Sequence, residues 1–102
     1  MRTPKSLSIA GHAINVVHKE DLVCESTDCW GIYDDEKHTI YLRKGMEKTR
    51  KMEILLHEAI HAIDHIHVLK LSEKAVKTLG VEILALIRNN RINLLERRKP
   101  TK

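Results

Sequence analysis

The segment LLHEAIHAIDH, residues 55–65, decides how this chain folds. Its apolar residues recur at helical spacing and fall on one side of an α-helix, the side that is expected to face a core. His57, His61, Asp64 and His65 fall on the opposite side. We therefore expect a long amphipathic helix from about residue 47 to residue 68. Its apolar stripe consists of Met52, Leu55, Leu56, Ala59, Ile63 and Ile66.

The polar side of this helix carries a His-Glu-x-x-His pattern at residues 57–61. Residues four apart lie one above the other on a helix, so His57 and His61 can bind the same metal ion. Glu58 is turned about 100° around the helix, where it can hydrogen-bond a metal-bound water and accept its proton. Ordinary surface histidines are the competing explanation. The apolar stripe around them favours the zinc chemistry of metalloproteases.

Catalytic zinc takes three protein ligands and leaves a fourth position for water, so the helix itself lacks one ligand. His65 is eight residues from His57, about 12 Å along the helix axis, which is too far to share one ion. Asp64 is better placed to accept a hydrogen bond from a ligand imidazole. A surface carboxylate paired with a nearby cation is an equally good explanation for Asp64.

The third ligand is expected on a second helix, which a short connection at residues 69–71 folds back against the first. Ser72 is a candidate N-cap for that helix, which is expected to span Glu73 to about Asn89. Its two candidate ligands are Glu73 and Glu82. Glu73 falls within the arc of the apolar stripe, where a carboxylate needs a partner, whereas Glu82 falls at its edge. We prefer Glu73, although an acidic residue in a first helical turn is also favoured by the helix dipole.

The rest of the sequence indicates one small α+β domain, residues 1–102, with a core at about residues 6–90. A hairpin is expected over residues 6–18 with its turn at Gly11, and a second between residues 30–33 and 39–42. Such a small core has little margin of stability, so a bound metal would help to hold the fold. Leu, Ile and Val must fill that core, because the chain has three aromatic residues and no Phe.

The formal net charge of +4 is concentrated at the C-terminal end. We expect residues 91–102 to form a solvated basic tail and regard nucleic-acid binding through it as the weaker alternative. The chain has no apolar run of signal-peptide or membrane-spanning length, so we expect no membrane contact and a cytoplasmic location. The sequence does not indicate an oligomeric state.

Several other side chains carry weaker expectations. Cys24 and Cys29 could form a small disulfide loop or join a metal site, but two reduced thiols are expected in a cytoplasmic protein. Trp30 is expected in the core. Supporting a substrate carbonyl oxygen is a possible role for three side chains of the second hairpin, although side chains on a strand usually just cover a sheet. These are Tyr33, Tyr41 and His38.

Three stretches, DCWGIYDDEKHTIYL, LLHEAIHAIDH and LSEKAVKTLGVEILALIRNN, resemble the short phage and bacterial members of the ImmA/IrrE-like zinc metallopeptidases, and more broadly minimal gluzincins. The resemblance covers roughly residues 6–90. It implies a zincin-type fold, in which a small sheet of two hairpins packs on the His-Glu-x-x-His helix and its edge strand aligns an extended peptide. It also implies a third ligand at Glu73, through the Leu-Ser-Glu match. A Glu-Ala-Asn sequence, found near this place in longer relatives, is absent.

The sequence therefore predicts a zinc-dependent endopeptidase in which His57, His61 and Glu73 bind zinc and Glu58 activates the attacking water. Its partner would be a protein or peptide substrate, and the resemblance suggests a transcriptional regulator in a bacterial or phage-infected cell. The alternative is a non-catalytic zinc-binding module that holds a regulator protein or nucleic acid.

Overall fold

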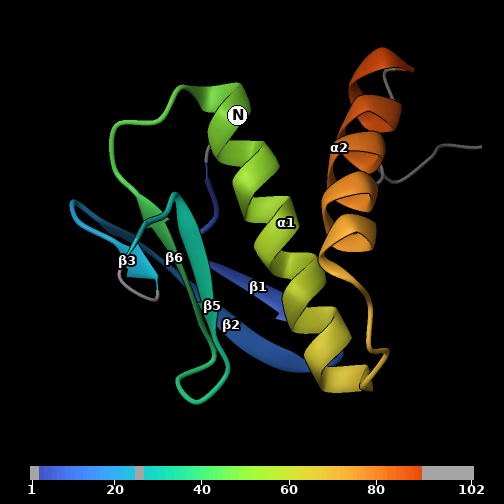
Figure 1. Ribbon diagram of the computed structural model, residues 1–102, viewed down its shortest axis with the longest axis horizontal. Helices are drawn as coiled ribbons and strands as arrows, with labels where there is room; N and C mark the ends of the chain where they lie inside the picture. The colour runs from blue at the N-terminus through green and yellow to red at the C-terminus, as the bar shows by residue number, and fades with distance from the viewer. Residues whose placement is uncertain (1–2, 25–26, 91–102) are drawn as a thin grey trace, which may run out of the picture.

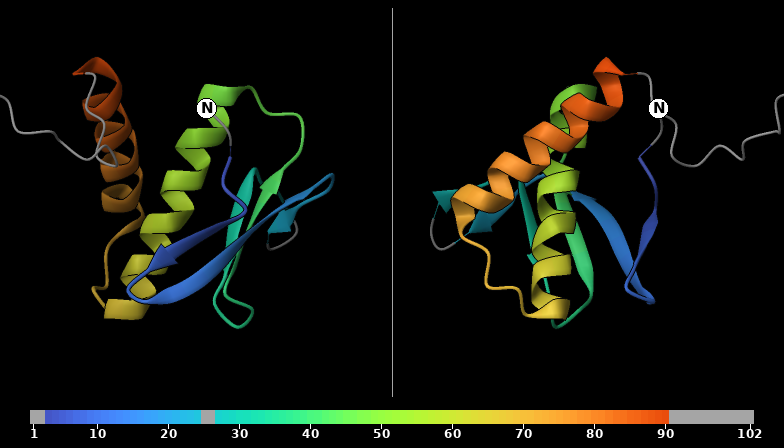
Figure 2. Two further views of the ribbon diagram at one scale, coloured as in Figure 1. Left: turned by 180° about the vertical axis from the view of Figure 1, so that it is seen from behind. Right: turned by 90° about the vertical axis from the view of Figure 1, so that its right-hand side faces the viewer.

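The computed structural model describes residues 3–24 and 27–90, and the basic tail at residues 91–102 lies outside the described part. A mixed four-stranded sheet, helix α1 (Lys48–His67) and helix α2 (Glu73–Asn89) lie in three successive layers (Figure 1). Views from two further directions show the same order, with α1 between the sheet and α2 (Figure 2). The expected small α+β fold is confirmed.

The sheet is built from the two hairpins that the sequence predicts. Strands β1 (Ser6–Ile9) and β2 (His12–Lys19) pair antiparallel across a turn at Ala10 and Gly11, as do β5 (Gly31–Asp34) and β6 (Thr39–Arg43). Positive φ angles of 52° and 81° at the first turn explain the glycine there. Parallel pairing of β2 with β6 joins the hairpins in the order β1-β2-β6-β5. Strand β5 therefore lies at one edge of the sheet.

A small second sheet, which the sequence did not predict, is formed by residues that lie between β2 and β5 in the chain. Strands β3 (Val23–Cys24) and β4 (Thr27–Asp28) pair antiparallel, and each is too short to show an alternating pattern. The expectation of two reduced thiols is wrong for Cys29, which is disulfide-bonded. The side chain of Cys24 lies outside the described part of the chain.

The core lies between the sheet and α1. Leu55 and Ala62 of the helix are buried there against strand residues that include Ile14, Ile40 and Leu42, none of which has any exposed surface. Met52, Ala59 and Ile66 pack against this cluster, as their place in the predicted stripe indicates. Three positions differ from that stripe. Ile63 is 38% exposed. Ile54 and Ile60 are outside the stripe, but Ile54 packs against the core cluster and Ile60 is buried near α2.

Capping side chains set the start of each helix. The Glu47 carboxylate accepts a hydrogen bond from the Arg50 N–H before α1. The Ser72 hydroxyl accepts one from the Ala75 N–H at 3.0 Å, which confirms Ser72 as the N-cap of α2. None of the described helices is both long and apolar enough to cross a bilayer.

Candidate metal centre

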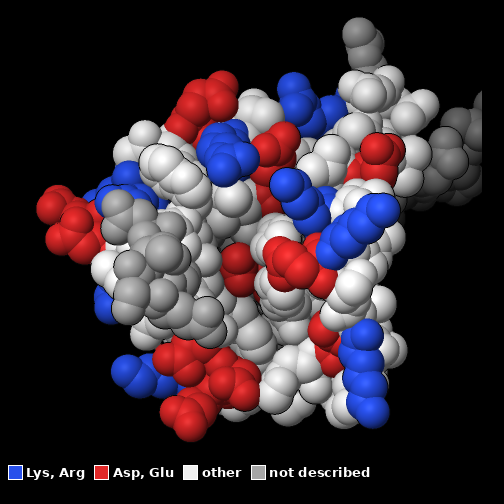
Figure 3. Space-filling model, viewed as in Figure 1, with Lys and Arg blue, Asp and Glu red and all other residues white. Residues whose placement is uncertain are grey.

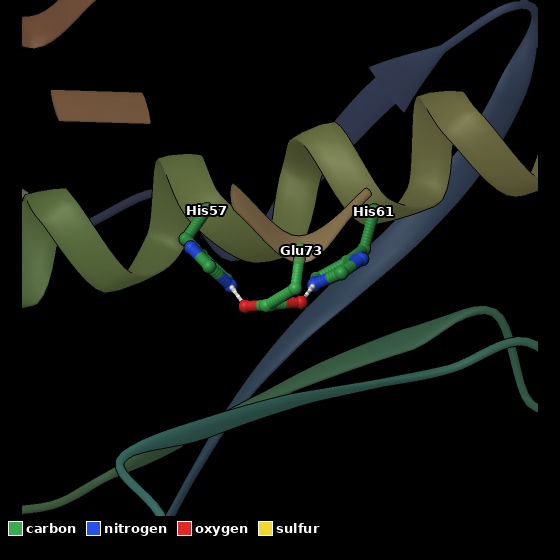
Figure 4. Close-up of side chains that lie close together, drawn as sticks. All are labelled: His57, His61 and Glu73. Atoms are coloured by element: carbon green, nitrogen blue, oxygen red, sulfur yellow. Dashed lines mark ion pairs between the residues drawn. The ribbon is translucent and has the colours of Figure 1, made fainter. Parts of the chain in front are cut away.

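Three side chains from two helices converge on one point. The Nε2 atoms of His57 and His61 lie 2.9 Å and 3.1 Å from the two carboxylate oxygens of Glu73 (Figure 4). One ligand atom from each residue lies within 4.8 Å of the other two, so the group could hold a metal ion. Tetrahedral zinc with bonds of about 2.1 Å separates its ligand atoms by about 3.4 Å. The side chains would need to move only slightly to bind it.

Local structure explains why Glu73 reaches the histidines. Helix α2 begins at Glu73, directly after its Ser72 cap, and the connection from α1 is fixed by Asp64. The Asp64 carboxylate accepts a hydrogen bond from the Leu71 N–H at 3.2 Å. Farther along α2, the buried Gly80 lies against the backbone of His57, which a Cβ at residue 80 would approach to 3.6 Å. The two helices therefore cross closely beside the histidines.

Burial favours a neutral imidazole at His57. Burial lowers the pKa of His57 below its usual value, and the positive charge of Lys77 acts in the same direction. The carboxylate of Glu73 opposes this shift. A neutral imidazole is the form that binds a metal ion.

Glu58 is a buried carboxyl group beside this centre. Its side chain is among the few buried polar groups of the described chain, with 8% of the residue exposed. Burial raises its pKa to about 7, and the nearby charge of Glu73 adds to the shift. A hydrogen bond from the backbone N–H of Tyr33 opposes the shift and holds the carboxyl group against strand β5. Glu58 can therefore both accept and donate a proton near neutral pH.

Strand β5 approaches α1 very closely, and Gly31 makes this possible. A Cβ at residue 31 would lie 2.5 Å from Cγ2 of Ile54 and 3.3 Å from Cγ of Glu58. A side chain at residue 31 would force the Ile54 side chain to move. The glycine thus places the backbone of the edge strand next to the buried carboxyl group.

The outer edge of β5 faces the same space. The Arg43 N–H donates to the Trp30 carbonyl, so alternate residues of β5 bond to β6, and the intervening Gly31 and Tyr33 direct their backbone groups away from β6. The Tyr33 N–H bonds Glu58, which agrees with this direction. Polar backbone groups of an edge strand therefore line the approach to the candidate metal centre.

A cleft of about 950 Å³ lies between this strand edge and the two helices. His57, His61, Glu58 and Glu73 all line it. Residues of β5, of the segments beside it in the chain, of α1 and of α2 form the rest of its walls. The remaining side chains and glycines of these walls are Val23, Cys29, Trp30, Gly31, Ile32, Tyr33, Asp35, Arg50, Glu53, Ile54, His65, Lys77, Gly80 and Val81.

Other candidates from the helices lie apart from the metal group. Glu82 is exposed and does not line the cleft. His65 lines the cleft but bonds Asp35, with 3.2 Å between Nε2 and Oδ2, and its ring meets the edge of Tyr33. Asp64 supports the backbone of the α1–α2 connection, so neither of its two predicted roles describes the contact that it makes.

The second hairpin contributes one of its three candidates to the cleft. Tyr33 lines it, and its buried hydroxyl bonds no group of the described chain. Tyr41 lies outside, with Lys19 Nζ 4.6 Å above its ring, and His38 stacks on His12. The expectation that Trp30 lies in the core is wrong, because it is 45% exposed and lines the cleft.

Sequence patterns did not reveal two cations of the cleft, Arg50 and Lys77. Arg50 lies on the same face of α1 as His57, two turns earlier, and Lys77 lies one turn after Glu73 on α2. Helical spacing from the ligands could have identified both. They were not predicted because Lys and Arg are common on the solvent-exposed face of any helix.

Comparisons with family models, curated proteins and solved structures find no match to this chain. Any inference about the function of the protein therefore rests on the geometry of this site.

Proposed function

We propose that this protein is a zinc-dependent endopeptidase. The observation that carries the proposal is a buried carboxyl group, Glu58, directly beside a His-His-Glu donor set and an open strand edge. Two imidazoles and one carboxylate are a ligand set typical of catalytic zinc, which keeps a position open for water. Zinc bound there would act as a Lewis acid toward water and the peptide carbonyl.

Glu58 supplies the proton transfers that peptide hydrolysis needs. Because the pKa of Glu58 is about 7, its carboxyl group is ionised in a large fraction of the molecules at neutral pH and can accept a proton from the attacking water. The same group then donates that proton to the leaving amine. The hydrogen bond from the Tyr33 N–H fixes the orientation of the carboxyl group.

Strand β5 supports a peptide as the substrate. An extended chain can add to this edge through the outward backbone groups of Gly31 and Tyr33 other than the Tyr33 N–H, which already bonds Glu58. Such pairing requires a substrate segment that is unfolded or at a chain end. A protein with an exposed extended segment, including a transcriptional regulator, fits this requirement.

The test is cleavage of a pool of capped synthetic peptides, followed by mass spectrometry, with wild-type protein and Glu58→Gln, both loaded with zinc. Glu58→Gln should keep one zinc ion per chain and lose about 10²–10⁴-fold in rate. Glu82→Gln makes the same chemical change at an exposed position outside the cleft and should cleave normally. Equal activity of Glu58→Gln and wild type would refute the proposal. A chain that binds zinc and cleaves no peptide would be the non-catalytic module.

A further inference from the structure

The connection between α1 and α2 adopts a backbone conformation that its residues disfavour. Val68 directly follows α1 with a φ of 52° and a ψ of 53°, and Lys70 has a φ of 62°. Both φ angles lie in the left-handed region, which suits glycine and is unfavourable for a β-branched residue such as valine. Many helices end with a glycine at the place that Val68 occupies. The connection is therefore strained at two of its residues.

Burial does not offset this strain. Val68 is 68% exposed and Leu69 is 51% exposed, and the side chain of Lys70 is exposed as well. The connection therefore gains little from the hydrophobic effect. A backbone held in a sparsely populated region persists only where other contacts fix it. For residues 68–71, those contacts come from hydrogen bonds and from the packing of α2 on α1.

Asp64 holds the connection in place through three hydrogen bonds. Its backbone carbonyl accepts from the N–H groups of Val68 and Leu69. Its carboxylate accepts from the Leu71 N–H at 3.2 Å. A hydrogen bond to a charged acceptor is stronger than one between neutral groups. One residue of α1 thus latches three of the four residues 68–71.

Few contacts hold α2 at the metal centre. Only Val76 and Gly80 of this helix are buried. Within the described part of the chain, Glu73 makes the only ion pairs between α2 and another element, and both go to the histidines of the candidate metal centre. Basic side chains over α2 lie along the outer surface of the molecule (Figure 3). The position of α2 therefore depends largely on what Glu73 binds.

Undocking of α2 from α1 would relieve the strain at little cost to the core. The core cluster lies between the sheet and α1, so α2 can move without disturbing it. Val68 and Lys70 can then return to the negative φ angles that most residues favour. Elements with few buried apolar contacts open at a low free-energy cost. The docked fraction of α2 therefore responds to single changes in the connection.

We propose that residues 68–71 form a strained hinge, latched by Asp64, that controls whether Glu73 reaches the two histidines. When the hinge relaxes, the start of α2 moves off α1, and both the third ligand and one wall of the cleft move with it. Binding of Glu73 to a metal ion draws the helix back and strains the hinge. This control rests on the proposed function, because the ligand set is taken to be His57, His61 and Glu73.

The hinge makes zinc affinity depend on the docked fraction of α2. Binding that needs the docked form is weakened in proportion to the fraction of molecules in that form. This fraction stays well below one without metal, so the chain holds zinc less tightly than the same three ligands would on a rigid scaffold. A peptide in the cleft contacts both β5 and α2 and favours the docked form as well. Zinc and peptide therefore strengthen each other's binding.

The first test compares the zinc affinities of variants of the whole chain by competition with a chelator. Val68→Asn relieves strain, because asparagine tolerates the left-handed region, and should raise zinc affinity about threefold. Ala10→Asn makes the matched change in the β1–β2 turn, where Ala10 also has a φ of 52°. It places the favoured Asn-Gly pair in that turn, and should raise the free energy of unfolding without changing zinc affinity. Equal zinc affinities of Val68→Asn and wild type would overturn the inference, as would an equal gain in Ala10→Asn.

The second test removes the latch. Asp64→Ala should lower zinc affinity about tenfold, because the Leu71 N–H loses a charged acceptor, whereas Asp64→Asn keeps an acceptor oxygen and should retain most of the affinity. The amide NMR shift of Gly80, which lies against the His57 backbone when α2 is docked, reports the docked fraction without metal. It should move toward its zinc-bound value in Val68→Asn and away from it in Asp64→Ala. A fall in zinc affinity with no movement of this shift would assign Asp64 to the support of a ligand imidazole and overturn the latch.

Peptide cleavage by the same variants separates this inference from the proposed function. Zinc affinity that follows the hinge in a protein that cleaves no peptide overturns the proposed function and leaves the hinge. Cleavage by a protein whose zinc affinity is the same in all hinge variants overturns the hinge alone. Failure of wild type to bind zinc overturns both.

Discussion

Helices α1 and α2 both contribute to the candidate metal centre, but they are held in the molecule very differently. Helix α1 packs against strands on one side and against α2 on the other, and buries Leu55, Glu58, Ile60 and Ala62. Helix α2 buries only Val76 and Gly80. Among the described elements, α1 is the only one against which α2 packs extensively.

This difference divides the site into a rigid part and a part that can move. His57, Glu58 and His61 belong to the helix at the centre of the fold, whereas Glu73 lies in the first turn of α2 with 68% of its side chain exposed. Regions with few buried apolar contacts open at lower free-energy cost than the core. Metal binding should therefore depend on how well α2 stays docked, and should itself hold α2 in place.

Zinc should protect the start of α2 against undocking. Zinc at a thousand times its dissociation constant adds about 4 kcal/mol to the free energy of any opening that releases the ion, whether undocking of α2 or global unfolding. Without zinc, hydrogen exchange should be much faster at the start of α2 than in the core strands, because α2 can undock while the core stays folded. Zinc should slow exchange at the start of α2 by about the free energy that it adds to global unfolding. Equal protection of α2 and the core strands without zinc would mean that α2 is as firmly held as α1.

Two variants of α2 identify the residue that couples zinc to this helix. Glu73→Ala should lose the zinc-dependent protection of α2 and lower zinc affinity by more than about a hundredfold, which exceeds the effect of removing a supporting group. Glu82→Ala, at an exposed position of the same helix, should change neither. Loss of zinc in the Glu82 variant alone would assign the third ligand to Glu82.

Glu58 should make the rigid part of the metal-free protein less stable as the pH rises. Its pKa in the folded protein is about 7, against 4.5 for an ordinary glutamate, so folding favours the protonated form. The penalty is absent below about pH 4.5, grows as the pH rises toward 7, and reaches about 3 kcal/mol. Glu58→Gln should remove it. Urea unfolding in a chelator at pH 4 and pH 8 measures the difference.

The free energy of unfolding of the Glu58→Gln variant should exceed that of wild type only at pH 8. Glu82→Gln provides the control, because that side chain is exposed, and its stability should follow wild type at both values. Parallel stability curves for wild type and Glu58→Gln would show that the carboxyl group is ionised at little cost. Burying the Glu58 carboxyl group would then not lower the free energy of unfolding at high pH.

Gly31→Ala should disturb the contact between β5 and α1. The new Cβ would lie 2.5 Å from Cγ2 of Ile54, and overpacking of this kind costs about 1–3 kcal/mol. Gly80→Ala is the matched change at the α1–α2 crossing, where the nearest atom is 3.6 Å away, and should be neutral or stabilising. Ile54→Ala should restore part of the stability lost in Gly31→Ala. Equal cost at residues 31 and 80 would mean that the two contacts of α1 are equally tight.

The sequence was informative wherever a short-range pattern determines structure. Helical spacing predicted both helices and the Ser72 cap, and alternation predicted both hairpins. It also led to Glu73 rather than Glu82, because only a residue within the apolar arc can face α1. The structure brings Glu73 to the two histidines, while its role as a zinc ligand stays a prediction.

Features that depend on long-range packing were not predictable from the sequence. The parallel pairing of β2 with β6 joins strands that are distant in the chain, and no local pattern specifies it. Trp30 was expected in the core, but its position directly before an edge strand leaves it in the cleft under the guanidinium of Arg43. The closeness of β5 to α1 depends on the lack of a side chain at Gly31. This requirement becomes clear only when the atoms that surround Gly31 in the structure are known.

Ser72→Ala should give the smallest effect and the most direct test of how α2 is held. Loss of the N-cap costs about 1 kcal/mol of helix stability, since the Ala75 N–H loses its acceptor. If the first turn of α2 is already largely undocked without zinc, this cost lowers zinc affinity about fivefold, because only the docked fraction binds. If the turn stays docked, zinc affinity is unchanged. Glu47→Ala removes the corresponding cap of α1 and should leave zinc affinity alone in either case, because that helix is held by the core. Zinc titration of the two cap variants thus measures how far α2 is free to move.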